Sequence, residues 1–316
     1  MAFYPRKKAA RIYPTVTSFR HTEKPVMLGF VGYKAGMTHI IATDTYENSP
    51  SYGQKVSLPV TILETPPLFV FGARLYEKTP YGLKILGDVY TDKPIKDLDR
   101  ILNLPEKYDM AKAIAEAEKE KHRIAQVRVI VSTQPSKIHL KKTPELVEIA
   151  IGGKPEEAMK HALELLGKEV HSHSVFAEGA YVDVTGITTG KGTQGPVKRF
   201  GIKIQHRKAH GHLRMPGSIG AFSPPRVFHT VPMKGQMGFQ RRTELNKLVL
   251  KLGKDGKEAT PLGGLIGYGN VSGDYMLVKG SLPGPKKRLL YLRHALRKEK
   301  PRAIPTISMI STHSQQ

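Results

Sequence analysis

The chain has 316 residues, a formal net charge of +23 and no cysteine. Without thiols it can form neither disulfides nor thiolate zinc sites. It contains no apolar run of about eighteen residues and no apolar stretch near its N-terminus, which excludes a membrane span and a secretory signal. We therefore expect a soluble, cytoplasmic protein.

The positive charge is concentrated in three segments. Residues 1–24 carry six basic and one acidic residue, residues 184–243 carry eleven and none, and residues 284–302 carry eight and one. The remaining chain is neutral, with 25 residues of each sign. This pattern predicts a neutral body with basic appendages that attract a polyanion.

The first appendage begins with four basic residues between Arg6 and Arg11. Pro5 and Pro14 disfavour a continuous helix there. The segment is either a disordered tail or an arm that becomes ordered along phosphates, and the pattern leaves both open.

The body predicts a mainly β fold. Short apolar runs rich in β-branched and aromatic residues alternate with Gly and Pro, as is typical of strands in a closed or nearly closed barrel. The predicted strands lie within residues 27–44, 56–67, 68–77, 83–91, 126–134, 145–153, 180–190, 246–253, 263–271, 274–284 and 288–296.

Two segments favour helix instead. Within residues 98–125, Met110, Ile114 and Ala117 recur at helical spacing. Residues 154–167 place Pro155 in a first helical turn, followed by two glutamates and, at the end, a glycine. Both segments belong to an α-helical insertion in the β body.

These observations predict a division of the chain into seven parts. They are a basic N-terminal arm (1–24), the first part of the β-barrel (25–93), an insertion with helices and strands (94–169), a barrel strand (170–185), an extended basic finger (186–242), the last part of the barrel (243–297) and a C-terminal tail (298–316).

Residues 186–242, here called the basic loop, lie in a stretch of sixty residues without Asp or Glu. Few apolar side chains, ten glycines between residues 184 and 243 and mutual charge repulsion prevent such a segment from folding alone. Nucleic acid fits as the partner, because its phosphates supply negative charge and its bases can stack on aromatic rings. The candidate stacking residues are Phe200, Phe222, Phe228 and Phe239.

Phe222 stands near the middle of the basic loop, which places it at the tip if both limbs have equal length. Small residues precede it and Pro224 and Pro225 follow it, which predicts a narrow, stiff end with one large flat side chain. The alternative is a local anchor folded back on Ile219 or Val227.

Enzyme motifs fail in the basic loop. Gly190, Gly192 and Gly195 match a dinucleotide fingerprint, but Pro196 and Gly201 follow where an apolar helix is needed. The spacing of a Walker A loop is also absent. Because the loop lacks carboxylates, it offers neither a magnesium ligand nor a general base. We predict no catalytic residue, no cofactor and no small-molecule substrate.

Three histidines of the basic loop, at positions 206, 210 and 212, raise the question of a metal site. Arg207, Lys208 and Arg214 lie among them, and neighbouring cations oppose the binding of another cation. We therefore interpret the imidazoles as contacts to phosphates or bases and predict no metal.

Several motifs together resemble one family. They are GYKAGMTHI (32–40), TGITTGKGTQGPVKRFG (185–201), GSIGAFSPPRVF (217–228) and MKGQMG (233–238), followed by Arg241 and Arg242. The combination is similar to the universal large-subunit ribosomal protein number three in its archaeal and eukaryotic form, and the resemblance covers nearly the whole chain. Eukaryotic members carry Trp where this chain has Phe222.

The resemblance implies a six-stranded barrel like that of translation factors, with a helical insertion and a long finger. It implies binding near the 3′ end of large-subunit (23S-type) rRNA, nucleation of subunit assembly, and a finger directed toward the peptidyl transferase centre. It also implies protein neighbours in the large subunit, including the one numbered fourteen.

Resemblance and charge pattern together predict a set of rRNA-binding residues. They are Arg6, Lys7, Lys8, Arg11, Lys191, Lys198, Arg199, Lys203, His206, Arg207, Lys208, His210, His212, Arg214, Phe222, Arg226, Lys234, Arg241, Arg242, Lys286, Lys287 and Arg288.

Two other functions compete with a structural ribosomal protein. An RNA-modifying or translation-associated enzyme could use a similar barrel, and a turnover assay on RNA would identify it. A DNA-compacting protein is disfavoured by the neutral β body and the lack of a recognition-helix motif.

Overall fold

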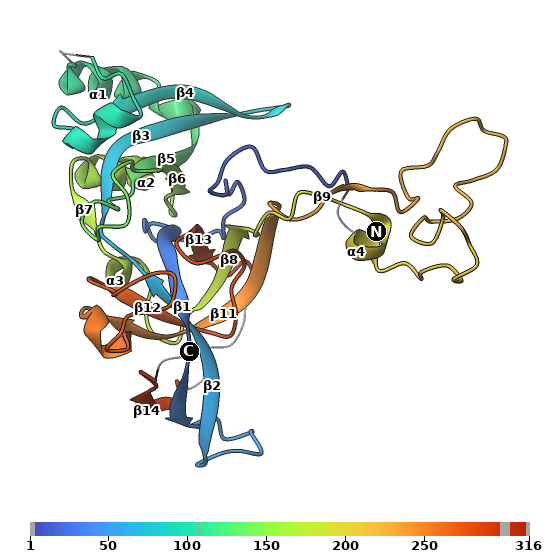
Figure 1. Ribbon diagram of the computed structural model, residues 1–316. Helices are drawn as coiled ribbons and strands as arrows, with labels where there is room; N and C mark the ends of the chain where they lie inside the picture. The colour runs from blue at the N-terminus through green and yellow to red at the C-terminus, as the bar shows by residue number, and fades with distance from the viewer. Residues whose placement is uncertain (1–3, 106–107, 298–303, 314–316) are drawn as a thin grey trace. The chain divides into compact units, whose positions relative to one another are not determined.

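The computed structural model describes residues 4–105, 108–297 and 304–313 (Figure 1). The chain divides into two compact units. The smaller unit consists of Met1–Ile12 and Ile187–Arg242, and the larger one of Tyr13–Gly186 and Thr243–Gln316. Residues 13–24, which the charge pattern groups with the arm, thus belong to the larger unit. No helix in the described part of the chain has the length and apolarity that crossing a membrane requires.

The larger unit contains a ring of paired strands. The order of pairing is β13-β8-β11-β12-β2-β1, and β13 also pairs with β1, so that the series returns to its start. These strands are β1 (Gly29–Thr43), β2 (Lys55–Glu64), β8 (Tyr181–Ile187), β11 (Arg241–Gly253), β12 (Tyr275–Lys279) and β13 (Leu289–His294).

The strands of the ring bury branched and aromatic side chains in two clusters. Phe30 and Leu290 belong to one cluster and Ile62 and Leu250 to the other, and each of the four is at most 1% exposed. Such burial stabilises the folded state by about 1.5–3 kcal/mol per side chain. The mainly β fold expected from the apolar runs is confirmed.

One further strand, β14 (Thr306–Ile310), pairs with the second half of β1, where Ile40 faces Ile310. Residues 298–316 were expected to form a C-terminal tail. β1 is 15 residues long, and β13 pairs only with Gly29–Tyr33. The rest of that edge of β1 is open to β14, which satisfies backbone groups that would otherwise lack ladder partners.

A second sheet in the larger unit has the order β4-β3-β5-β6, with β7 paired to β3. Helix α1 packs against β4, and α2 packs against β5 and β3 (Figure 1). The elements are β3 (Leu68–Thr79), β4 (Gly82–Tyr90), η1 (Lys96–Arg100), α1 (Met110–Lys119), η2 (Lys121–Arg123), β5 (Ile124–Ser132), β6 (Leu146–Ala150), α2 (Pro155–Leu165), β7 (Glu169–Val170) and α3 (Ser172–Val175).

The two predicted helices are present with sharper limits. α2 begins at Pro155 with two glutamates in its first turn, as its sequence indicates. α1 begins only at Met110, where the side chain of Asp109 accepts a hydrogen bond from the backbone N–H of Lys112. The preceding residues form the single turn η1, whose Leu98 is fully buried.

The strand predicted at residues 263–271 is wrong. The segment forms turns held by a single bridge between Leu265 and Gly269, after the short turn η3 (Gly256–Ala259). Gly264, Gly267 and Gly269 have φ angles of 76°, 72° and 109°, which an extended ladder does not accommodate. The apolar residues between these glycines are too few to impose pairing.

A continuous hydrophobic core joins the ring to the second sheet. Leu63 and Leu290 of the ring belong to the same buried cluster as Val129 and Ile149 of the second sheet. The larger unit is therefore one packed body.

Candidate nucleic-acid interface

The two limbs of the basic loop are paired where they leave the ring. The N–H of Thr188 donates to Gln240 O (3.0 Å), and Lys191 and Met237 continue the pairing through the N–H of Lys191 and Met237 O (3.0 Å). Next come the two-residue strands β9 (Thr193–Gln194) and β10 (Gly235–Gln236). The base is close-packed, because a Cβ at Gly238 would lie 2.1 Å from Thr189 O.

A short helix, α4 (Pro196–Phe200), follows the paired base, within the segment expected to form an extended basic finger. It ends at Gly201, whose φ of 67° terminates the helix. From α4, the guanidinium of Arg199 donates to Gln236 O (3.1 Å) and Met233 O (2.9 Å). Arg199 therefore connects one limb of the loop to the other instead of extending into solvent.

The N-terminal arm packs on α4 within the smaller unit. The ring of Tyr4 stacks on Phe200 (centroids 6.3 Å apart), and the guanidinium of Arg6 lies 4.5 Å from the Phe200 centroid. The N–H of Ala9 donates to Phe239 O (2.8 Å). Arg6 is thus half-buried and stabilises the unit, while Lys7, Lys8 and Arg11 are exposed. No pattern in the sequence predicts the contact of Tyr4 with Phe200.

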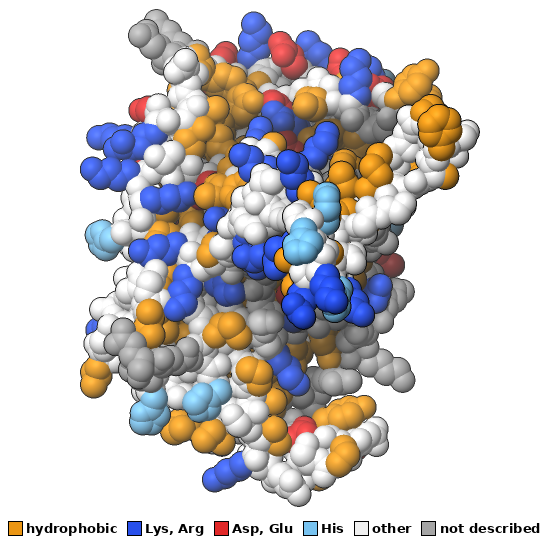
Figure 2. Space-filling model, turned by 45° about the vertical axis from the view of Figure 1, so that its right-hand side comes forward, with side chains coloured by type: hydrophobic (Ala, Val, Ile, Leu, Met, Phe, Trp, Pro, Cys, Tyr) orange, Lys and Arg blue, Asp and Glu red, His pale blue; other side chains and the backbone are white. Residues whose placement is uncertain are grey.

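Most of the predicted basic contacts of the loop are exposed. Arg199 and Arg242 are partly buried, whereas the exposed side chains are Lys191, Lys198, Lys203, His206, Arg207, Lys208, His210, His212, Arg214, Arg226, Lys234 and Arg241. Figure 2 shows Lys, Arg and His side chains gathered on the face turned to the viewer, among few acidic ones. Within the described part of the chain, Lys203, Arg207, Lys208 and Arg214 form no ion pair.

The four phenylalanines of the loop differ in exposure. Phe222 is 100% exposed and Phe228 47% exposed, so their faces are accessible to a base. Phe200 and Phe239 are half-buried, and Phe200 is occupied by the arm. The prediction that all four stack on bases therefore has support for only two.

The three histidines at the centre of the loop are exposed and have different contacts. His206 accepts through Nδ1 from the N–H of Lys208 (3.3 Å), and Nδ1 of His212 lies 3.1 Å from the sulfur of Met215. The structure does not gather them around a common point with any carboxylate.

A basic turn in the larger unit contains the remaining predicted contacts. Lys286 and Lys287 are exposed and Arg288 is partly buried. Lys34, buried in β1, holds the start of this turn by donating through Nζ to Leu282 O (2.6 Å) and Gly284 O (3.1 Å). Burial lowers the pKa of Lys34, and Glu244 partly opposes that shift. Sequence reasoning missed Lys34, since a lysine in a strand carries no sign of a carbonyl partner.

Arg293, counted in the basic segment 284–302, is neutralised inside the protein. Its Nη2 lies 3.2 Å from Oδ2 of Asp183, and Asp183 is fully buried. Its Nη1 also donates to Ser18 O (2.7 Å). The exposed cations in the described part of this segment are Lys286 and Lys287 before β13 and Arg297 after it. Its lysines at 298 and 300 and arginine at 302 lie outside the described residues.

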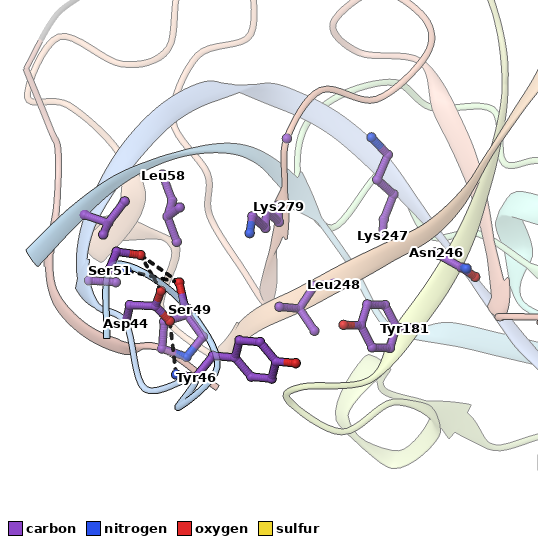
Figure 3. A pocket seen from close by; sticks show the side chains of 14 residues that line it. Asp44, Tyr46, Ser49, Ser51, Leu58, Tyr181, Asn246, Lys247, Leu248 and Lys279 are labelled. Carbon is purple, nitrogen blue, oxygen red and sulfur yellow. Dashed lines mark hydrogen bonds between the residues drawn. The ribbon is translucent and has the colours of Figure 1, made fainter. Parts of the chain in front are cut away.

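The larger unit also contains a pocket of about 600 Å³ between the end of β1 and the strands β11 and β12 (Figure 3). Lys247 and Lys279 line it, and its one carboxylate is that of Asp44. Hydrogen bonds from Ser51, Ser49 and Tyr46 lower the pKa of Asp44 to about 2. Since this carboxylate remains ionised and holds its own turn, it is not poised as a general acid or base.

Comparisons with known proteins agree with these features. The family model described as "Ribosomal protein L3" matches residues 1–316. The chain is 49% identical to the large ribosomal subunit protein uL3 of Methanothermobacter thermautotrophicus, with 100% of this chain and 96% of the relative aligned. It is 45% identical to the uL3 proteins of Methanobrevibacter smithii and Archaeoglobus fulgidus, over 100% and 95% of this chain and 96% and 91% of the relatives.

Members of this family are structural components of the large ribosomal subunit in the cytoplasm, and they are not enzymes. The chain accordingly belongs to a ribonucleoprotein that contains rRNA and other ribosomal proteins. This accounts for the exposed cations of the basic loop on a body whose charge is balanced. Full-length coverage and the level of identity place the chain in the ribosomal protein L3 family.

Proposed function

We propose that the chain is a primary rRNA-binding protein whose basic loop and N-terminal arm contact the RNA directly. The observation that carries this proposal is the exposure of Lys203, Arg207, Lys208 and Arg214 in a stretch without any acidic residue. Like charges on one extended segment repel each other, and RNA phosphates compensate them. The lysines and arginines in turn release the counterions condensed on the RNA.

The RNA contacts divide into direct and indirect ones. The exposed lysines and arginines of the loop, together with Lys7, Lys8, Lys286 and Lys287, bind phosphates. Arg6 and Arg199 act indirectly, because their guanidinium groups already stabilise the smaller unit. Phe222 offers an accessible face for stacking on a base.

The target is the region near the 3′ end of 23S-type rRNA, and binding there nucleates assembly of the large subunit. The basic loop acts as a finger directed toward the peptidyl transferase centre. The ring of strands serves as a six-stranded barrel of the translation-factor type, with residues 94–169 as its insertion. The neighbouring proteins include the one numbered fourteen. These assignments rest on the family resemblance, together with the closed series of strand pairs.

The experiment is a salt titration of binding to a 3′-terminal fragment of 23S-type rRNA. The logarithm of the affinity should fall linearly with the logarithm of the salt concentration, with a slope of about −0.7 to −0.9 per neutralised phosphate. Replacing Lys203, Arg207 and Lys208 with Ala should make this slope shallower by about two to three.

A matched control removes the same charge elsewhere. Lys112, Lys119 and Lys160 are exposed on the helices of the insertion, and their replacement with Ala should leave the slope unchanged. Equal effects of the two triple variants would mean that net charge, not the basic loop, binds the RNA.

A further inference from the structure

His171, His173 and Asp274 form a cluster in the larger unit, apart from the residues assigned to RNA. Each offers one ligand atom, and these atoms all lie within 4.8 Å of one another. Nδ1 of His171 is 2.9 Å from Oδ2 of Asp274, and the rings of His171 and His173 stack with centroids 5.1 Å apart. Imidazole nitrogen and carboxylate oxygen are the donors that Zn²⁺ and its neighbours in the first transition series accept.

We propose that His171, His173 and Asp274 bind one divalent transition-metal ion of the Zn²⁺, Co²⁺ or Ni²⁺ class, with water completing the coordination. The site has no part in the RNA contacts proposed above.

One buried residue, Thr65, holds both sides of the cluster. Its N–H donates to Asp274 O (2.8 Å), and its hydroxyl lies 3.2 Å from that of Ser172, the residue between the two histidines. Thr65 is fully buried and Ser172 is 2% exposed. The ligands therefore project from backbone positions that are already in place, which lowers the entropy cost of binding.

Hydrogen bonds to a buried carboxylate support the turn that bears Asp274. The carboxylate of Glu64, 1% exposed, accepts from the N–H of Ser272 (2.7 Å) and of Gly273 (3.3 Å) and from the phenol of Tyr268. Such a set of partners holds the segment entering Asp274 in one conformation. Positioning of ligands by surrounding hydrogen bonds is typical of metal sites in proteins.

A tetrahedral ion sets the spacing that the ligand atoms must reach. Two ligand atoms at about 2.0–2.1 Å from such an ion lie roughly 3.3 Å apart. The 2.9 Å pair of His171 and Asp274 must therefore open by a few tenths of an ångström, with Nδ1 of His171 free of a proton. The neutral imidazole meets this condition as the tautomer that carries its proton on Nε2. His173 is exposed and can rotate inward without disturbing the core.

The electrostatic setting also differs from that of the loop histidines. The carboxylate of Asp274, with Oδ2 2.9 Å from Nδ1 of His171, supplies negative charge at this cluster. His206, His210 and His212 have only cationic neighbours in sequence and no carboxylate in their loop. A cation is thus favoured at His171 and disfavoured at the loop.

The test uses the full chain, purified without a polyhistidine tag and freed of RNA. Titration with Co²⁺ near neutral pH should give visible ligand-field absorption that saturates at one ion per chain, and Zn²⁺ should abolish it. Calorimetric titration with Zn²⁺ should give the same stoichiometry of one ion per chain. His173→Ala should raise the Kd at least about tenfold, with the thermal midpoint of the metal-free protein unchanged.

Matched histidine variants distinguish this site from unspecific binding. His122→Ala removes an imidazole from the helical insertion, and the triple variant His206→Ala, His210→Ala, His212→Ala removes those of the loop; both should bind Co²⁺ as the wild type does. Absence of saturable binding, an unchanged Kd in His173→Ala, or loss of binding in the loop variant would each overturn the proposal.

Discussion

The phenol of Tyr33 donates a 2.6 Å hydrogen bond to Oε2 of Glu145, and this buried pair links β1 of the ring to the residue before β6 of the second sheet. Thr133 donates to the same carboxylate oxygen (3.3 Å), and Lys141 pairs with the other oxygen. Tyr33 belongs to the GYKAG motif at the start of the chain. This part of the family motif therefore has a structural role.

Tyr33→Phe should destabilise the protein by about 1–3 kcal/mol, because a buried carboxylate loses a donor that no water replaces. Urea unfolding at neutral pH measures the change. Tyr81→Phe, at a fully exposed position between β3 and β4, is the control and should have no measurable effect. Equal stability of wild type and Tyr33→Phe would show that the ring and the second sheet do not depend on this link.

The same pair predicts a dependence on alkaline pH. Burial, followed by the charge of Glu145 and the hydrogen bond to it, raises the pKa of Tyr33 well above its ordinary value of 10.0. A raised folded-state pKa means that the stabilisation is complete below about pH 10 and is lost as the pH rises above it. Between about pH 9 and pH 11 the wild type should lose more free energy of unfolding than Tyr33→Phe. A loss of equal size in both would contradict the assignment.

Substitutions of Lys34 and Lys286 should distinguish a residue that stabilises the protein from one that binds RNA. Lys34→Met removes the charged donor to Leu282 O and Gly284 O and should cost about 1.5–3 kcal/mol of stability. Lys286→Met removes an exposed charge and its hydrogen bond to Ile266 O at the surface, and should cost less stability than Lys34→Met while weakening RNA binding. Urea unfolding and RNA titration on both variants measure these effects. A larger loss of stability in Lys286→Met than in Lys34→Met would contradict the prediction.

The neighbours Lys198 and Arg199 offer a sharper comparison, since both were predicted as direct RNA contacts. Arg199→Ala should loosen the connection between the limbs, because the carbonyls of Gln236 and Met233 lose their donor. Limited proteolysis of the free protein should then cut within residues 201–235 faster than in the wild type. Lys198→Ala, which removes an exposed side chain, should leave the cleavage rate unchanged and lower only the RNA affinity. Equal cleavage rates in both variants would mean that Arg199 does not stabilise the connection between the limbs and binds RNA directly.

Local signals explain what the sequence predicted well. Pro155 and two glutamates mark the start of α2 within three adjacent residues, and the absence of acids in the basic loop is visible without any structure. Contacts between distant residues were not accessible in the same way. Arg199 reaches a carbonyl 37 residues away and Lys34 one 248 residues away, and a backbone acceptor leaves no trace in sequence. Residues 263–271 were wrongly predicted as a strand because apolar residues lie between the glycines at 264, 267 and 269. The backbone angles of these glycines do not permit an extended strand.

Phe222 distinguishes a role in the finished subunit from one in assembly. Its side chain is fully exposed, so the alternative of a local anchor packed on Ile219 or Val227 has no support. Gly220 has a φ of 143°, which L side chains rarely adopt, and Pro224 restricts the backbone after Phe222. An exposed aromatic ring at this place can stack on an RNA base, a contact that contributes about 1–3 kcal/mol.

Phe222→Ala should leave the unfolding free energy and the yield of large subunits near wild type, because the exposed cations of the loop remain. Purified subunits that carry Phe222→Ala should show altered handling of tRNA or factors in translation. Subunits that carry Phe222→Trp should behave as the wild type does, because an indole also stacks on a base. Phe200→Ala is the matched control: its ring packs against Tyr4 and Arg6, so its loss should release the N-terminal arm to protease and impair assembly. If Phe222→Ala instead impaired assembly while tRNA and factor handling stayed normal, Phe222 would be needed for the loop's own packing, and its placement at a functional tip would be wrong.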